Sequence, residues 1–184
     1  MVAGGYLFVA ALLNSRVREL ASAGSRTLFI LIATCYALAM EITTNSAVET
    51  KKVASDFGRK LVGASSKTAR VVGLVGELGA GKTTFAQGFA QALGIKEKIQ
   101  SPTFVLMKIY PVARGNVQHF VHIDCYRIDD PDELVHLGFA DILKDKDAMV
   151  VIEWAERVKG LLPKDTIWIT LLHGQKESER ILKL

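Results

Sequence analysis

The feature that most constrains the fold is residues 71–86, which read VVGLVGELGAGKTTFA. Residues 71–75 have the length and valine content of a buried strand. Residues 82–93 read as a helix that Gly94 ends. Between the two, residues 76–83 match G-x-x-x-x-G-K-T, the pattern of a phosphate-binding loop that joins a strand to a helix. The segment therefore predicts an α/β protein that binds a nucleotide.

The residue types of this loop indicate how it would hold phosphates. Gly76, Gly79 and Gly81 let the backbone curl so that successive N–H groups, with the helix N-terminus, stabilise phosphate charge. Lys82 is expected to bridge the β- and γ-phosphates, and the Thr83 hydroxyl to bind Mg²⁺. The predicted nucleotide-binding residues of the loop are Gly76, Glu77, Leu78, Gly79, Ala80, Gly81, Lys82, Thr83 and Thr84. The last of these is expected to support a contact with the α-phosphate.

A Mg²⁺ ion bound with the phosphates needs a carboxylate nearby, usually at the end of a neighbouring hydrophobic strand. Residues 119–124 end in Asp124, and residues 149–153 end in Glu153. Open parallel sheets place their ligands beside the C-terminal ends of the strands. At least one of the two carboxylates is therefore predicted to face Mg²⁺ or the attacking water, and the candidate catalytic residues are Lys82, Asp124 and Glu153. The sequence leaves open which carboxylate has which role.

The sequence also narrows the choice of base. GTPases generally read guanine with an N-K-x-D tetrapeptide, and no such tetrapeptide occurs in the chain. ATP with Mg²⁺ is therefore favoured.

The patterns around the loop extend the α/β prediction over residues 40–184. Ser46 and Glu49 form an S-x-x-E capping box, and the apolar repeat that follows predicts a helix ending near Gly63. Further strands are predicted at 104–110, 119–124, 149–153, 167–172 and 181–184, and further helices after Asp130-Pro131 and at 155–162. This alternation predicts a three-layer sandwich like that of P-loop NTPases, with a mostly parallel central sheet and some antiparallel strands.

Residues 1–39 depart from this organisation. Two apolar runs, 1–13 and 28–40, each have about a dozen residues, fewer than the roughly 18 that a membrane-spanning helix needs. The first run lacks the preceding charge and the cleavage site of a signal peptide. Two weak membrane segments are one interpretation, and an extension from an upstream start, with the native protein beginning at Met40, is the preferred one. No stable membrane association is expected of residues 40–184.

The cysteine content favours a cytoplasmic location, and the charge does not mark a nucleic-acid surface. Cys35 and Cys125 lie far apart in sequence, so free thiols in a reducing compartment are expected. The net charge of +4 is mild, and no run of lysines and arginines marks a patch.

Three further motifs accompany the phosphate loop. They are Ser-Pro-Thr-Phe at 101–104, His-Ile-Asp-Cys-Tyr-Arg at 122–127 and Ile-Glu-Trp at 152–154. With Gly-Glu-Leu-Gly-Ala-Gly-Lys-Thr-Thr-Phe at 76–85, their order and spacing resemble the TsaE (YjeE) family, over residues from about 41 to the C-terminus. Each of the three is weakly specific alone, and the combination is specific.

The resemblance implies a small bacterial α/β ATPase needed to make N6-threonylcarbamoyladenosine at position 37 of tRNAs that decode ANN codons. It implies that the partner proteins TsaD and TsaB carry out threonylcarbamoyl transfer and that the ATPase resets their site between rounds. Involvement with tRNA would then be indirect. Carried over by motif, Lys82 and Thr83 bind phosphate and Mg²⁺, while Asp124 and Glu153 serve the metal and the hydrolytic water.

The resemblance also adds residues that the loop alone does not indicate. Thr103 lies in a stretch similar to the family's switch-type loop and would sense the γ-phosphate, although a plain Ser-Pro turn before a strand remains the alternative. Trp154 is similar to the family's tryptophan near the nucleotide, with a core tryptophan as the alternative. His122, Tyr126 and Arg127 share the segment that carries Asp124, and they would dock to a partner or shape the site, with a structural role as the alternative for His122.

Two positions depart from the family pattern. Ala155 stands where proline commonly follows Ile-Glu-Trp, and Gln87 stands where arginine is common on the helix after the phosphate loop. Neither change removes a group that ATP hydrolysis requires.

Two other functions fit a phosphate loop. A small-molecule kinase would need an acceptor pocket and usually an arginine-bearing lid, and the charged stretch 141–147 contains no arginine. A scaffold that binds nucleotide without hydrolysis would not need Asp124 and Glu153. An accessory ATPase is therefore the preferred prediction, with the kinase as the alternative.

Overall fold

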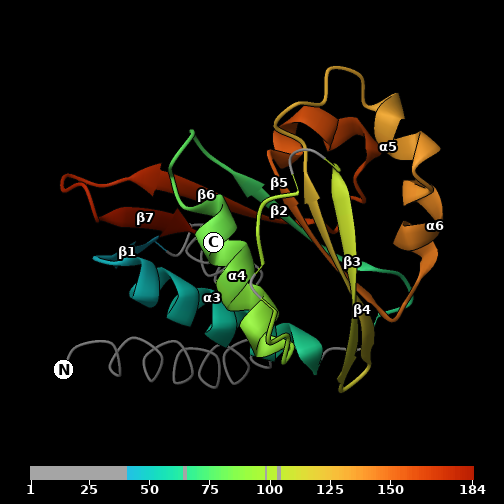
Figure 1. Ribbon diagram of the computed structural model, residues 1–184, viewed down its shortest axis with the longest axis horizontal. Coiled ribbons are helices and arrows are strands. Elements are labelled where there is room, and N and C mark those ends of the chain that lie inside the picture. The colour runs from blue at the N-terminus through green and yellow to red at the C-terminus, as the bar shows by residue number, and fades with distance from the viewer. Residues whose placement is uncertain (1–40, 64–65, 98, 103–104) are drawn as a thin grey trace, which may run out of the picture. The chain divides into compact units, whose positions relative to one another are not determined.

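The computed structural model describes residues 41–63, 66–97, 99–102 and 105–184. Within these residues the chain forms a seven-stranded sheet in the order β1-β7-β6-β2-β5-β4-β3 (Figure 1). The strands are β1 Glu41–Thr44, β2 Arg70–Val75, β3 Met107–Arg114, β4 Val117–Asp124, β5 Ala148–Glu153, β6 Ile167–His173 and β7 Arg180–Lys183. The helices are α3 Ala47–Val62, α4 Lys82–Ala92, α5 Asp132–His136, α6 Phe139–Lys144 and the 3₁₀ helix η1 Ala155–Leu161.

The centre of the sheet is parallel and its two sides are antiparallel. β2 pairs in parallel with β5 and β6, and β4 pairs in parallel with β5. β3 is antiparallel to β4 on one side, and β7 is antiparallel to β6 and β1 on the other. The predicted parallel centre with additional antiparallel strands is thereby confirmed.

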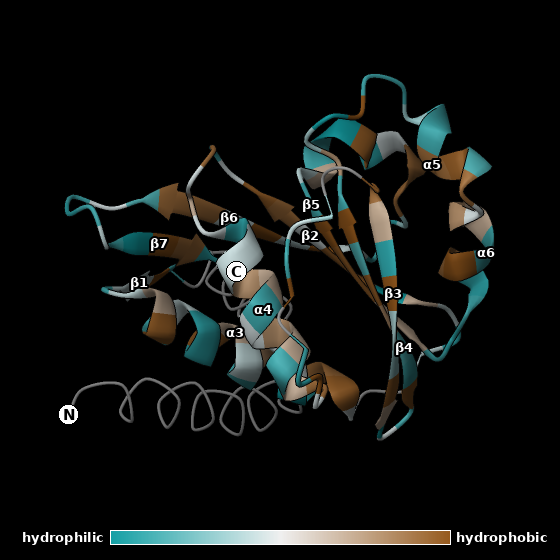
Figure 2. Cartoon of the chain, viewed as in Figure 1, coloured by the Kyte–Doolittle hydropathy of each residue, from teal (hydrophilic) through white to brown (hydrophobic). Residues whose placement is uncertain are grey.

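Each face of the sheet has its own hydrophobic core, because alternate side chains of a strand point to opposite faces. On β2, Val72 and Leu74 pack in one core with Phe85 and Phe89 of α4. Val71 belongs to the other core, which includes residues of α5, α6 and η1. Figure 2 shows hydrophobic residues concentrated along the central strands. Helices on both faces complete the predicted three layers.

Helix α3 begins as its sequence predicts. The Ser46 hydroxyl accepts a hydrogen bond from the Glu49 amide at 3.2 Å. The Glu49 carboxylate accepts one from the Asn45 amide at 2.8 Å, one residue before the position that a capping box specifies. The helix ends at Val62, as expected from Gly63.

Helices α3 and α4 approach closely at Gly88. A Cβ atom at Gly88 would lie 2.3 Å from the Lys51 carbonyl oxygen, so the position requires glycine. This contact holds α4, which follows the phosphate loop, against α3.

Two predicted elements differ from the structure. The strand predicted at 104–110 begins at Met107 and continues through Pro111 to Arg114, with a register irregularity between Pro111 and Arg114. Proline is tolerated there because β3 lies at the edge of the sheet in the described part of the chain. The helix predicted at 155–162 is a 3₁₀ helix with non-helical angles at Val158. β1 and α6 have no counterpart among the predicted elements.

The predictions for residues 1–39, including their place outside the domain, concern residues that the structure does not describe. In the part of the chain that it does describe, no helix is long and apolar enough to cross a membrane.

Candidate functional site

The phosphate-loop sequence connects β2 to α4, as predicted, and its backbone needs glycine. Gly76, Gly79 and Gly81 have φ angles of 147°, 76° and 98°, which side chains of L residues rarely adopt. At Gly76 a Cβ atom would also lie 2.2 Å from the carbonyl oxygen of Leu171 in β6. The conformation of the loop therefore depends on close packing against β6 as well as on its own glycines.

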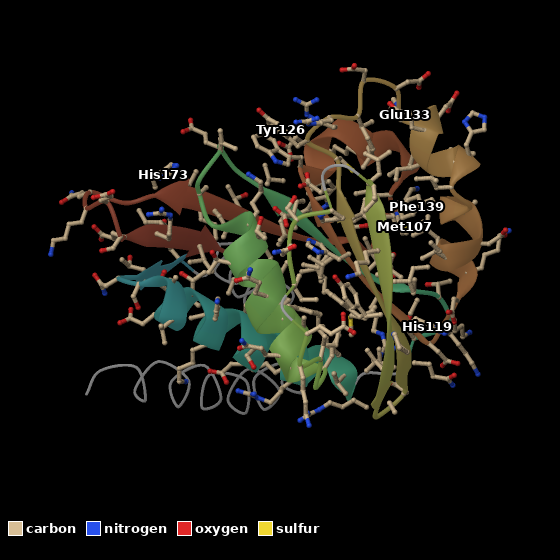
Figure 3. The ribbon with its side chains drawn as sticks, viewed as in Figure 1. Met107, His119, Tyr126, Glu133, Phe139 and His173 are labelled. Atoms are coloured by element: carbon tan, nitrogen blue, oxygen red, sulfur yellow. The ribbon has the colours of Figure 1, made fainter. Side chains whose placement is uncertain are left out.

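Two side chains of the β6–β7 hairpin bond to the outer part of the loop. His173, labelled in Figure 3, lies with a ring nitrogen, Nε2, 3.1 Å from the Leu78 carbonyl oxygen. Arg180 donates to the Gly79 carbonyl oxygen from Nε at 3.3 Å and from Nη2 at 3.0 Å. The sequence does not predict either residue as part of the site. Both reach the loop because β6 lies next to β2 in the sheet, and no local motif indicates that arrangement.

Lys82 is buried and turned toward the loop's own backbone. Its Nζ donates to the carbonyl oxygens of Gly76 at 2.7 Å and Glu77 at 2.8 Å. The same atom lies 3.7 Å from the centre of the Trp154 ring, in cation–π contact. Burial lowers the pKa of the Lys82 ammonium, and the nearby carboxylates of Glu153, Glu156 and Asp124 oppose that shift. The site thus combines a desolvated cation with acidic groups.

The two predicted carboxylates lie side by side. Asp124 ends β4 and Glu153 ends β5, and the two are direct partners in the parallel register. Both side chains are buried. The structure therefore brings together the C-terminal ends of these strands, as the sequence predicts, and the β2 end that carries the loop is next to β5.

Glu153 is linked to the loop and to the neighbouring strand at once. Its Oε2 accepts a hydrogen bond from the Thr83 hydroxyl at 2.8 Å. Its Oε1 lies 2.9 Å from Nε2 of His122, and the two side chains are 3% and 0% exposed. Glu153 is therefore the carboxylate that joins Thr83 of the loop to β4.

Asp124 has a different set of partners. The Ser101 hydroxyl donates to Oδ2, and the Tyr126 amide donates to Oδ1 at 2.9 Å. The Asp124 amide donates to the carbonyl oxygen of Leu106, also at 2.9 Å. Asp124 thus connects the strand end to the segment around the Ser-Pro-Thr-Phe motif. Thr103 itself lies outside the described residues.

Trp154 has a backbone conformation that is uncommon for its residue type. Its φ of 58° turns the chain between β5 and η1. The indole ring lies 5.2 Å from the Tyr126 ring, and the Arg157 guanidinium lies 5.8 Å from the indole. Tyr126, labelled in Figure 3, is partly exposed. These side chains form an aromatic and cationic border beside Lys82.

The remaining predicted positions have ordinary surroundings. Thr84 is half-buried in the first turn of α4. Gln87, where the family commonly has arginine, donates to the Ile99 carbonyl oxygen at 2.8 Å and so ties α4 to the segment before Ser101. Ala155 is fully buried.

The chemistry of the donor set fits Mg²⁺. The Thr83 hydroxyl and the carboxylates of Glu153 and Asp124 offer oxygen ligands, which Mg²⁺ prefers, beside a loop suited to phosphate. In the described residues, no group of three or more His, Cys, Asp and Glu side chains could hold a metal by itself, so phosphate and water oxygens would complete the coordination.

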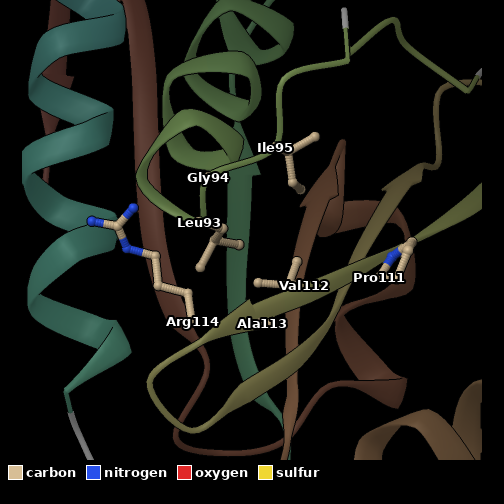
Figure 4. A pocket seen from close by; sticks show the side chains of 7 residues that line it. All are labelled: Leu93, Gly94, Ile95, Pro111, Val112, Ala113 and Arg114. Carbon is tan, nitrogen blue, oxygen red and sulfur yellow. The ribbon is translucent and has the colours of Figure 1, made fainter.

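A pocket of about 290 Å³ lies elsewhere, where α4 ends near β3 (Figure 4). It is lined by Leu93, Gly94, Ile95, Pro111, Val112, Ala113 and Arg114. None of the predicted site residues lines it, so it does not bear on the phosphate loop.

Comparison with known proteins matches this fold and sequence to one family. The family model described as "Threonylcarbamoyl adenosine biosynthesis protein TsaE" matches residues 44–182. A Haemophilus influenzae protein named "tRNA threonylcarbamoyladenosine biosynthesis protein TsaE" is 37% identical over 119 residues, covering 62% of this chain and 73% of its own. A Bacillus subtilis protein of the same name is 35% identical over 133 residues, covering 72% and 77%.

A solved structure agrees with these sequence matches. The crystal structure of Bacillus subtilis YdiB is similar with a TM-score of 0.59 and 30% sequence identity, covering 78% of this chain and 82% of that one. Since the family model spans most of the chain, including the loop and both carboxylates, the chain belongs to the TsaE family.

Proposed function

We propose that this protein hydrolyses ATP in support of the threonylcarbamoylation of adenosine 37 in tRNA, acting on a TsaD–TsaB partner complex. The pathway is supported by the names of the family and of its relatives. One observation carries the ATPase proposal: Glu153 bonds directly to Thr83, the residue after the loop lysine. This joins the phosphate loop to a buried carboxylate of the kind that ATP hydrolysis needs.

The loop and Lys82 would bind the phosphates. Backbone N–H groups near the start of α4 favour negative charge. The Lys82 ammonium is partly desolvated, so its attraction to phosphate oxygens is stronger than it would be in water. Its present contacts with the loop carbonyl oxygens and with Trp154 keep it oriented within the site.

Thr83 and Glu153 would hold Mg²⁺, with Asp124 beside them. When bound, the ion would neutralise charge on the phosphates during transfer to water. The hydrogen bonds support different roles for the two carboxylates, because Glu153 contacts Thr83, whereas Asp124 contacts Ser101 and the Tyr126 amide. Asp124 is therefore assigned to orienting the attacking water.

Exposed apolar side chains near the site support a protein partner. Leu78 in the loop is 71% exposed and Val105, which precedes β3, is 64% exposed. Tyr126, which follows β4, is also exposed. Apolar groups at the rim of a nucleotide site are suited to contact with another protein, and such contact would make turnover depend on the partner.

The test is ATP hydrolysis by the full chain, measured alone and with the TsaD–TsaB pair. Feeble turnover that the pair stimulates is expected. Phosphorylation of a metabolite in the absence of partners would instead favour a kinase, and binding without hydrolysis under either condition would favour a scaffold. Formation of threonylcarbamoyladenosine on tRNA, measured in the same mixtures, links the hydrolysis to the pathway.

A further inference from the structure

His122 and Glu153 form a buried contact that the roles assigned so far do not use. The distance from Nε2 of His122 to Oε1 of Glu153 is 2.9 Å, and the imidazole is completely buried. The other carboxylate oxygen, Oε2, accepts the Thr83 hydrogen bond. Glu153 therefore lies between Thr83 and His122, and each of its two carboxylate oxygens contacts one of them.

The imidazole is fixed by its own surroundings. Its ring stacks on Phe120 with centroids 6.3 Å apart and an angle of 21° between the planes. Phe120 stacks in turn on Phe89 of α4, at 6.1 Å and 23°. This aromatic column connects His122 to the helix that begins with Lys82 and carries Thr83, so the ring has little freedom to turn.

The hydrogen bond also specifies which nitrogen carries the proton. A carboxylate that is 3% exposed needs donors, because burying an unpaired charge is costly. Nε2 is the nitrogen that faces Glu153, and Nδ1 is buried without a hydrogen-bond partner among the described residues. The proton is therefore assigned to Nε2, which donates to Oε1.

We infer that His122 is a positioning residue that fixes the rotation of the Glu153 carboxylate so that Oε2 faces Thr83 and the metal side of the site. The inference rests on the proposed function, in which Thr83 and Glu153 hold Mg²⁺. Groups that hydrogen-bond to metal ligands orient them, and their loss typically lowers metal affinity about 10- to 100-fold.

Substitutions of His122 separate positioning from packing. His122→Gln keeps an N–H donor at about the reach of Nε2, His122→Asn shortens that reach, and His122→Leu removes the donor. The matched control is His119→Gln in the same strand, where an exposed histidine lies 3.0 Å from Asp145. ADP affinity of the full chain is measured by calorimetry across a Mg²⁺ series and without Mg²⁺, together with thermal unfolding.

We expect His122→Asn and His122→Leu to raise the Mg²⁺ concentration needed for tight ADP binding by about 10-fold or more. His122→Gln should recover most of that loss, and ADP affinity without Mg²⁺ should not change in any variant. Equal Mg²⁺ dependence in the Gln and Asn variants would overturn the inference, and this comparison stands even if His122→Leu does not fold.

Failure of the inference is distinguishable from failure of the proposed function. A wild-type chain that binds ADP with Mg²⁺ but does not hydrolyse ATP, alone or with TsaD–TsaB, contradicts the proposed ATPase while the Gln–Asn comparison still tests His122. A wild-type chain whose ADP affinity does not respond to Mg²⁺ overturns the inference and the assignment of Mg²⁺ to Thr83 and Glu153, whereas ATP hydrolysis by the same chain would still support the proposed ATPase.

Discussion

Asp124 and Glu153 are register partners at the ends of adjacent parallel strands, yet they bond to different parts of the site. Glu153 contacts Thr83 and His122, whereas Asp124 contacts Ser101 and the amide of Tyr126. Equivalent positions on adjacent strands therefore do not imply equivalent roles. Substitution of each carboxylate in turn can distinguish the two roles.

Glu153→Gln is expected to weaken nucleotide binding, whereas Asp124→Asn is expected to slow hydrolysis. Loss of the carboxylate charge beside Thr83 should weaken Mg²⁺-dependent ADP binding by at least the roughly 10- to 100-fold that is typical of losing a group that only orients a metal ligand. Loss of the charge at Asp124 should lower kcat by about 10²-fold or more and leave ADP affinity nearly unchanged. Calorimetry and single-turnover hydrolysis measure the two quantities. Equal losses in both would contradict the assignment of metal to Glu153 and water to Asp124.

Lys82→Ala should abolish most turnover, because it removes the cation that we propose binds the β- and γ-phosphates. We expect kcat/KM for partner-stimulated ATP hydrolysis to fall by at least about 10²-fold. Lys52→Ala is the matched control, since that lysine is exposed and pairs only weakly with Asp56 on the surface of α3. Unchanged hydrolysis by Lys82→Ala would contradict the site.

Gly76→Ala should destabilise the folded protein. The new Cβ would meet the Leu171 carbonyl oxygen at 2.2 Å, at a φ of 147°. A cost of about 1–3 kcal/mol in the free energy of unfolding is expected from the backbone strain alone. Gly63→Ala serves as the control because, among the described residues other than its chain neighbours and its own helix, no atom lies within 4 Å of its Cβ position. Urea unfolding followed by circular dichroism compares the two variants.

Arg180→Ala should loosen the loop at Gly79. Removing the donors to that carbonyl oxygen is expected to weaken ADP binding by about 3- to 10-fold, the equivalent of one ordinary hydrogen bond. Lys183→Ala, in the same strand, removes only an exposed ion pair with Glu41 at 3.5 Å and should leave the affinity as it is. Equal affinities in both variants would show that the Arg180 contact does not support the loop.

The Cys125 thiol should resist alkylation in the folded protein. It is fully buried, and burial, with the nearby charges of Asp124 and Glu156, raises its pKa to about 12. Below that pKa the reactive thiolate is scarce. In a Cys35→Ser background, a maleimide at pH 8 is expected to label the protein quickly in denaturant and slowly without it. Rapid labelling of the folded chain would contradict the burial.

The sequence predicts the site where a local pattern determines the structure. The loop follows from its glycines and from the strand and helix that flank it, and both carboxylates follow from apolar runs that end in an acid. Their proximity follows from a general property of parallel sheets, whose strands end at one edge. The hydrogen bonds that distinguish Glu153 from Asp124 depend on the positions of side chains in the folded protein. The spacing of residues in the sequence does not predict those positions.

Elements that depend on distant pairing are harder to predict. β1 is the short segment EITT, without a clear apolar alternation, and it becomes a strand by pairing with β7. His173 and Arg180 contact the loop only because β6 lies next to β2 in the sheet. The late start of β3 coincides with a positive φ of 59° at Leu106, a conformation that interrupts a strand.

The dependence of the phosphate loop on the β6–β7 hairpin has a consequence for synthesis of the protein. The loop at residues 76–83 leaves the ribosome well before Leu171, His173 and Arg180, which shape and brace it. A nascent chain that has reached η1 therefore carries the nucleotide-binding sequence without the strand against which Gly76 packs. We therefore expect the loop to complete its folding only after the hairpin is translated, and we expect a ribosome stalled before β6 to display a chain with the motif but without its native loop.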